Sequence, residues 1–312
     1  SVPLSAAEVW RALTGGAADG QSETAHTIVW QLRMPRTLLA LSVGGGLAVI
    51  GVAMQALVRN PLAEPYILGV SSGASAGASA FYLGFLPPLL SKSLSMPLAA
   101  FLGALLAITV VFLAARTGSR MSTTRLLLAG VAMSSFLAAV TAFVTYASPS
   151  ADRIRTVLFW LLGSFGSARW STVWLPLFFS VGGMGILWVL SRPLDALVTG
   201  EEPARSLGIP VEGLKRFLIL LSAAVTGILV AASGIIGFVG LIVPHAVRFL
   251  VGASHRRLIP LSFAVGALFM LAADLVARTA LSGQELPVGI LTALCGVPFF
   301  LILLRRTRMV PN

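Results

Sequence analysis

Residues 37–58 read TLLALSVGGGLAVIGVAMQALV, and this run contains no charged side chain. The hydrocarbon core of a bilayer takes about 20 apolar helical residues to cross. A second uncharged run follows at 126–149, and over the 312 residues 57% are hydrophobic and only 11% are charged. A water-soluble domain of this length does not carry so much apolar surface. The sequence therefore predicts an integral membrane protein.

The apolar runs are continuous and rich in Ala, Leu and Gly, whereas the strands of an outer-membrane barrel alternate apolar and polar residues. We therefore expect an all-α integral membrane protein, a polytopic helical bundle with one transmembrane domain over residues 1–312. Pro35 suits the start of the first helix. Nine transmembrane helices are predicted, at 36–58, 66–86, 97–116, 125–147, 170–191, 214–233, 238–252, 258–279 and 287–304.

The Lys and Arg residues set the orientation, because cytoplasmic loops carry the excess of basic residues. Fourteen of the 22 basic residues fall in loops on one side of the nine helices and eight on the other. The net charge of +11 thus belongs to loops and does not predict nucleic-acid binding. The carboxyl end is expected inside and Ser1 outside. Since an outside start without a signal is unusual, we also expect one further helix upstream of Ser1.

Three connecting segments are expected to be ordered. Residues 151–165 carry Trp160 and suit a short interfacial helix on the outer side. Residues 194–212 form the longest inner loop. Residues 233–244 hold three glycines and a proline, a density of helix breakers that predicts interrupted helices lining a cavity.

Small and charged residues inside the helices allow two interpretations each. Gly69, Gly73 and Gly77 recur at every fourth position, which favours close packing of another helix but also fits a helix that slides during transport. Asp274 lies four residues before Arg278, so the two can pair on one helix face. An intramembrane carboxylate could instead relay protons.

Two arginines, Arg33 and Arg36, flank the outer start of the first predicted helix. Their spacing of three places them near one helix face. Two guanidinium groups at a membrane mouth can receive carboxylates of a docking protein through bidentate hydrogen bonds. Anchoring to lipid headgroups is the alternative interpretation of the same pair.

Catalytic and metal sites find little support in the sequence. There is no Gly-Lys dipeptide, so a Walker motif for ATP is absent, and no histidine pair has ligand spacing on a helix. The lone cysteine, Cys295, cannot form an intrachain disulfide and is expected to be a small core residue. An intramembrane protease would need Ser71 and His245 to meet. We predict no catalytic residues and no metal site.

Long stretches of the chain are similar to the permeases of type II ABC importers for iron siderophores, haem and cobalamin, the FecCD or BtuC-like family. The resemblance covers nearly the whole chain, in the correct order. It is carried by LRMPRTLLAL (32–41), NPLAEPYILGVSSGASAG (60–77), EEPARSLGI (201–209), GIIGFVGLIVPHAVRFLVGASHRRLIP (234–260), LAADLVARTAL (271–281) and ELPVGILTALCGVPFF (285–300).

This resemblance implies a homodimer around one pathway, two cytoplasmic ATP-binding subunits that hold ATP and Mg, and a periplasmic substrate-binding protein. It implies ten helices in a subunit of the bacterial inner membrane, so the nine predicted here lack the family's first. It also implies that Arg33, Arg36 and Arg278 form salt bridges with the binding protein, and that Gly51, Met54 and Gln55 line the translocation path. No cofactor is expected on this chain itself.

The inner loop resembles the segment that such permeases lay into a cleft of the ATPase. Glu202, Ala204 and Gly208 match the family's loose E-x-A-x-x-x-G pattern, although Pro203 replaces the usual second alanine. A short helix with acids at its amino end and glycine after its last turn makes a rigid lever. The predicted coupling residues are Glu201, Glu202, Ala204, Arg205, Ser206, Leu207 and Gly208. The rival function is a secondary transporter driven by protons through Asp274.

Overall fold

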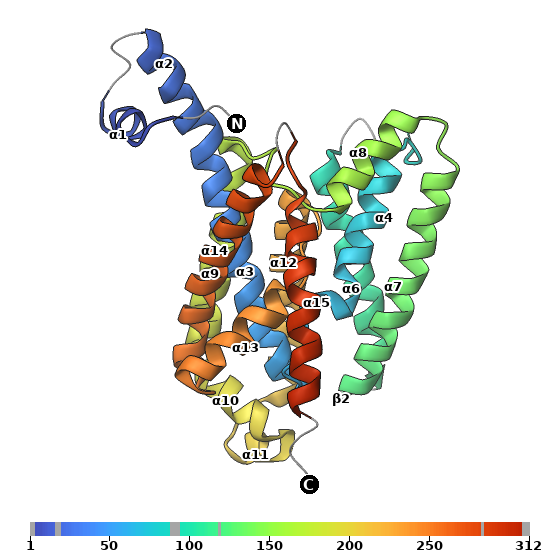
Figure 1. Cartoon of the computed structure of the whole chain (residues 1–312). Helices are drawn as coiled ribbons and strands as arrows, with labels where there is room; N and C mark the ends of the chain where they lie inside the picture. Colours follow the sequence, from blue (N-terminus) through green and yellow to red (C-terminus); the bar gives the residue numbers. More distant parts are fainter. Residues whose placement is uncertain (1–3, 16–19, 88–93, 118–119, 282–283, 308–312) are drawn as a thin grey trace.

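The computed structural model describes residues 4–15, 20–87, 94–117, 120–281 and 284–307. Within these residues the chain is a bundle of helices with one short hairpin of two strands (Figure 1). In chain order the elements are α1 (Ala6–Thr14), α2 (Gly20–Thr27), η1 (Ile28–Arg33), α3 (Met34–Val58), η2 (Pro65–Leu68), α4 (Val70–Tyr82), α6 (Met96–Ala115), β1 (Arg116–Thr117), β2 (Arg120–Met121), α7 (Thr123–Tyr146), α8 (Ala151–Leu161), α9 (Trp170–Val189), α10 (Ser191–Thr199), α11 (Glu201–Ser206), α12 (Val211–Ser233), α13 (Val239–Val251), α14 (His255–Thr279) and α15 (Val288–Thr307).

Six of the described helices are long and apolar enough to cross a membrane: α3 with its preceding turns, α6, α7, α9, α12 and α14. Two further apolar helices, α13 and α15, have shorter apolar parts, and α4 has only 13 residues. The predicted class, an all-helical polytopic membrane protein, is confirmed. The predicted number of nine transmembrane helices is not settled by these lengths.

The first helix starts earlier than the sequence suggested. Residues Glu23–Val58 form one helical stretch, so the prediction that the helix begins at residue 36 is wrong. Proline usually breaks a helix because it lacks an N–H and crowds the preceding turn. Here Pro35 follows the π-helical segment η1, in which the Met34 N–H bonds to the carbonyl of Val29, five residues back. The wider turn lets the helix continue through the proline.

The core of the bundle lies around α3, which is buried along most of its length and packs against α9, α12, α13 and α14. Gly44 of α3 meets Gly266 of α14, and Gly51 of α3 meets Gly240 of α13. A Cβ on Gly44, Gly266 or Gly51 would collide with the facing helix. Because lipid is as apolar as the helix surfaces, the hydrophobic effect does not hold membrane helices together. Close van der Waals contacts at small residues such as these stabilise the packing instead.

A second group of helices, α4, α6 and α7, packs together and stands apart from α3 and α14 in Figure 1. Gly73 and Gly77 of α4 lie directly against Gly103 and Ala99 of α6, which confirms the predicted packing role of this stripe. Gly69 instead ends η2 with a positive φ of 78°. The long helix α12 packs on both α3 and α6 and thereby joins the two groups.

The predicted helix breaks between 233 and 244 are present. α12 ends at Ser233, α13 starts at Val239, and the segment between them adjoins a cavity of about 620 Å³ that α8 and α15 also line. Glu64 accepts the N–H of Phe238 at 2.7 Å, and the Tyr66 hydroxyl donates to the carbonyl of Ile236 at 2.9 Å. These two side chains supply partners for backbone groups that a helix would otherwise pair.

The two ends of the bundle differ in what they carry. One end, called here the α8 end, holds α8, α1 and α2, and the opposite α11 end holds α11 and the β1–β2 hairpin (Figure 1). The predicted short helix of residues 151–165 is α8, which Ser150 caps and which ends at Leu161. Cys295 of α15 is exposed, so its expected place in the core is wrong.

At the α8 end, α1 folds back onto the turns that precede α3. The indole N–H of Trp30 donates to the carbonyl of Ala12 at 2.9 Å. Helix α1 begins with a capping box in which the Glu8 carboxylate accepts hydrogen bonds from Ser5. These hydrogen bonds lower the pKa of Glu8.

Candidate functional sites at the two ends of the bundle

An arginine pocket lies at the α8 end. Arg33 of η1, Arg36 of α3 and Arg278 of α14 all line one cavity of about 250 Å³, together with Glu285. The spacing of three brings Arg33 and Arg36 to one side of the continuous helix, and the packing of α14 on α3 adds Arg278. The structure thus brings the three arginines predicted for docking together.

Arg36 is held within this pocket by two carboxylates. Its Nε and Nη2 donate to Asp274 at 3.0 and 2.8 Å, and its Nη1 donates to Glu285 at 2.8 Å. The side chain of Asp274 is only 2% exposed and that of Arg36 12%. The predicted pair between Asp274 and Arg278 exists at 3.4 Å, but the closer partner of Asp274 is Arg36 on another helix.

This pairing bears on both interpretations of Asp274. Two guanidinium groups compensate one buried carboxylate, which favours a structural role over a proton relay. The pocket as a whole holds three arginines and two carboxylates and so keeps one net positive charge. A partner with surface carboxylates would meet a complementary field there.

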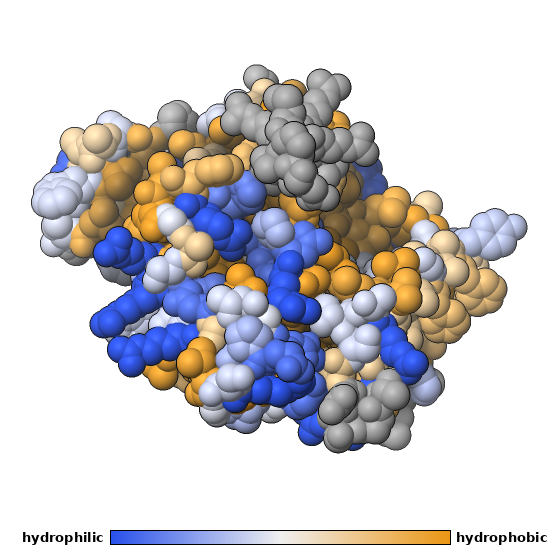
Figure 2. Space-filling view, turned by 90° about the horizontal axis from the view of Figure 1, so that it is seen from below, coloured by the Kyte–Doolittle hydropathy of each residue, from blue (hydrophilic) through white to orange (hydrophobic). Residues whose placement is uncertain are grey.

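The α11 end carries the predicted coupling segment. α11 starts at Glu201, directly after Gly200, and Gly208 follows its last turn with a φ of 79°. The side chain of Ala204 is fully buried and anchors the helix, whereas that of Glu202 is 93% exposed. Leu207, a large apolar residue, is 71% exposed. Figure 2 shows this end face on, with hydrophilic residues over much of the surface.

The profile of the FecCD transport family matches residues 1–306. The chain belongs to the FecCD transport family. It is 44% identical to the cobalamin import permease BtuC of Halobacterium salinarum, over 95% of this chain and 79% of that protein. It is 40% identical to the vitamin B12 import permease BtuC of Klebsiella pneumoniae, over 92% of this chain and 85% of that one.

One solved structure supports the same membership, and a second shares the fold. A metal-chelate-type ABC transporter in an inward-facing conformation superposes with a TM-score of 0.83 and 34% identity, covering 96% of each chain. The transporter PsaBC of Streptococcus pneumoniae, at 20% identity and a TM-score of 0.59 over 90% of this chain, shares the fold. The FecCD chain is therefore a multi-pass membrane permease.

The residues expected to line a translocation path are buried in this FecCD chain. Met54 has no exposed surface, Gln55 is 3% exposed, and Gly51 is packed against Gly240. Gln55 donates to the Gly240 carbonyl at 3.4 Å and accepts from Arg248 at 2.9 Å. In this conformation they hold α3 against α13 and line none of the cavities found among the described residues. Their role in the path stays a prediction.

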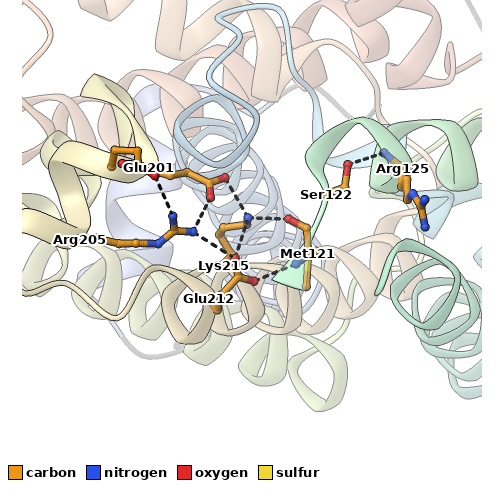
Figure 3. A network of polar contacts seen from close by, with 8 residues as sticks. Met121, Ser122, Arg125, Glu201, Arg205, Glu212 and Lys215 are labelled. Carbon is orange, nitrogen blue, oxygen red and sulfur yellow. Dashed lines mark hydrogen bonds and ion pairs between the residues drawn. The ribbon is translucent and has the colours of Figure 1, made fainter. Parts of the chain in front are cut away.

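Sequence reasoning missed a polar cluster beside the coupling segment. Lys215 lies near the start of α12 with its side chain 2% exposed, and its ammonium contacts Glu201 at 3.0 Å and Glu212 at 3.4 Å (Figure 3). The signal was available, because Glu212 and Lys215 are charges at spacing three beside a membrane helix. Glu285 and Glu64 were missed too, although both are acids beside predicted membrane helices.

Proposed function

We propose that this FecCD chain is the membrane-spanning subunit of an ATP-binding-cassette importer that carries cobalamin into the cytoplasm of a bacterium. Two copies form a homodimer in the inner membrane, and two ATP-binding subunits with ATP and Mg bind at the α11 end. A periplasmic substrate-binding protein docks at the α8 end. The chain itself is a transport subunit, binds no cofactor and contacts no nucleic acid.

The observation that supports this proposal is that two different polar surfaces lie at opposite ends of one apolar bundle. The arginine pocket at the α8 end offers net positive charge to an acidic partner. The α11 end offers a short helix with an anchored Ala204 and exposed Glu202 and Leu207. Such an arrangement suits a permease that receives cargo at one end and changes conformation when ATP-binding subunits act on the other.

Cobalamin is the favoured cargo because the relatives at 44% and 40% identity are cobalamin and vitamin B12 import permeases. The similar solved structure is of a metal-chelate type, so haem and ferric siderophores form the comparison set. The cavity of about 620 Å³ beside Gly237 and Phe238 is lined mainly by apolar residues, which provide surface for a bulky cargo without polar groups to retain it.

The experiment is uptake by proteoliposomes that contain the complex purified through a tag on this chain, with the substrate-binding protein added on the side of the α8 end. Radiolabelled cobalamin should accumulate only with ATP inside the compartment that faces the α11 end, and an uncoupler should leave uptake unchanged. Ferric siderophore and haem are offered in parallel. Uptake without ATP that an uncoupler abolishes would instead support the proton-driven transporter.

The docking surface gives a first prediction. Arg33→Glu should weaken capture of the substrate-binding protein and make it more sensitive to salt, because a like charge then faces the partner's carboxylates. Arg153→Glu on α8, exposed at the same end but outside the pocket, is the matched control. Binding is measured by pull-down at two salt concentrations, and equal affinities for both variants would remove Arg33 from the docking surface.

The coupling helix gives a second prediction. Gly208 has a φ of 79°, and nothing lies within 4 Å of the point that a Cβ would occupy, so the obstacle to a side chain there is backbone strain. Gly208→Val should cost about 1–2 kcal/mol locally and lower substrate-stimulated ATPase activity, whereas Gly208→Asn, which tolerates this conformation, should retain it. Normal stimulation in the valine variant would show that the helix end does not transmit movement.

A further inference from the structure

The ammonium group of Lys215 sits at a junction of three elements. It donates to the carbonyl of Met121 in β2 at 2.7 Å, to Glu201 of α11 at 3.0 Å and to Glu212 of α12 at 3.4 Å (Figure 3). An ammonium has three protons, so each has an acceptor. With a side chain only 2% exposed, Lys215 is compensated entirely by these contacts.

Met121 is held at both of its backbone groups. Its carbonyl accepts from Lys215, and its N–H donates to Oε2 of Glu212 at 2.9 Å. Within the hairpin, Met121 pairs with Arg116 of β1. Two side chains from the first turns of α12 therefore fix the hairpin that joins α6 to α7, and one of them also holds the first residue of α11.

The hairpin belongs to a larger body. α6 and α7 pack with α4, and Gly73 and Gly77 of α4 lie directly against the backbone of α6. A movement of the hairpin is therefore a movement of the α4–α6–α7 group. Coupling between sites needs such a continuous set of packed and bonded elements with defined contacts.

We propose that Lys215 is a positioning residue that makes the α4–α6–α7 group follow α11 when the ATP-binding subunit displaces the coupling helix. This role rests on the proposed function. Lys215 touches neither cargo nor ATP; it acts by holding Glu201 and the Met121 carbonyl at one point. Without it, the direct link from Glu201 of α11 to the Met121 carbonyl is lost, and the α4–α6–α7 group follows α11 less closely.

Arg205 is the second cation of this cluster. Its guanidinium contacts Glu201 at 3.0 Å and Glu212 at 3.7 Å, so it shares both carboxylates with Lys215. Its side chain is 41% exposed, and among the described residues its ion pairs run only to the acids of α11 and α12. In Lys215→Met both carboxylates keep Arg205 as a cation, and Glu212 keeps its bond to the Met121 N–H. This variant therefore loses chiefly the bond to the Met121 carbonyl and is expected to fold.

The first test measures coupling in proteoliposomes that contain the purified complex. Lys215→Met should lower the cobalamin moved for each ATP hydrolysed by about tenfold, which is the size usual for coupling between two sites. Lys215→Arg, which can reach the same acceptors, should restore most of the ratio. Arg192→Met on α10, an exposed arginine at the same end of the bundle but outside the predicted coupling residues, should stay within about twofold of the parent.

The second test measures the tie itself and needs no partner. Spin labels at Leu207→Cys and Thr124→Cys, both exposed positions, report the distance between the coupling segment and α7 in a Cys295→Ser background. The parent chain and Arg192→Met should give one narrow distance distribution in detergent. Lys215→Met should lose that narrow peak.

The two tests separate the possible failures. A parent complex that moves none of the three cargoes with ATP contradicts the proposed function, and the spin labels still decide whether Lys215 ties α11 to the hairpin. A parent that transports, together with a Lys215→Met variant that keeps both its transport ratio and its narrow peak, overturns the positioning role. The positioning role is supported if Lys215→Met loses both the transport ratio and the narrow peak while Arg192→Met keeps both.

Discussion

Arg36→Met lowers the free energy of unfolding of the chain by about 3–5 kcal/mol, the cost of removing one partner from a buried ion pair. Arg36 gives three hydrogen bonds of 2.8–3.1 Å to Asp274, whose side chain is 2% exposed. After the substitution the carboxylate keeps only the contact with Arg278 at 3.4 Å. The measurement is unfolding by sodium dodecyl sulfate titrated into detergent micelles.

The double variant Arg36→Met with Asp274→Asn is the control for this effect. Removing the charge of both partners leaves no unpaired buried carboxylate, so much of the lost stability should return. Arg205→Met, at an exposed pair, should cost only about 0–1 kcal/mol. If the single Arg36 variant is no less stable than the Arg205 variant, the pair is not a structural element and Arg36 is available to a docking partner.

Gly73→Ala separates α4 from α6 and destabilises the chain by about 1–3 kcal/mol, as overpacking does in a tight interface. The added Cβ collides with the carbonyl of Gly103 and lies 2.7 Å from the Cβ of Ala107. Backbone atoms on the facing helix cannot turn aside as a flexible side chain would. The same micelle titration measures the loss.

Gly182→Ala on α9 is the matched substitution, because nothing lies within 4 Å of its added Cβ. Alanine is the better helix former, so this variant should gain up to about 1 kcal/mol. The two changes are chemically identical and differ only in what faces the helix. Equal effects of the two would mean that the α4–α6 contact is looser than its glycines indicate.

The class of the protein and the places of its helices followed from the sequence because lipid imposes a length and a continuity on apolar runs. The early start of the first helix could not be predicted from the sequence. Pro35 locally predicts a helix start, and only the hydrogen bond of Met34 to Val29 reveals that a π turn carries the helix past it. Sequence rules treat a proline as a helix breaker because it lacks an N–H. They do not predict that the preceding turn widens to a π turn and lets the helix continue.

The sequence predicted which segments carry the candidate sites, but it did not predict which side chains pair with one another there. The spacing of Arg33 and Arg36 correctly placed both in one pocket, and the acids of α11 were expected at its amino end. The pairing of Arg36 with Asp274 joins residues 238 positions apart, and no pattern along the chain encodes it. The same is true of Lys215 and Met121, where the acceptor is a backbone carbonyl that every residue possesses.

The continuous helix through the arginine pocket has a mechanical consequence. Arg36 and Gln55 belong to the same α3, and 19 residues of helix at about 1.5 Å each separate them by about 29 Å. No loop interrupts that span, so one helix connects the arginine pocket to the contact of Gln55 with Arg248. A partner bound at the α8 end would therefore contact a helix that also packs on α13 about 29 Å away.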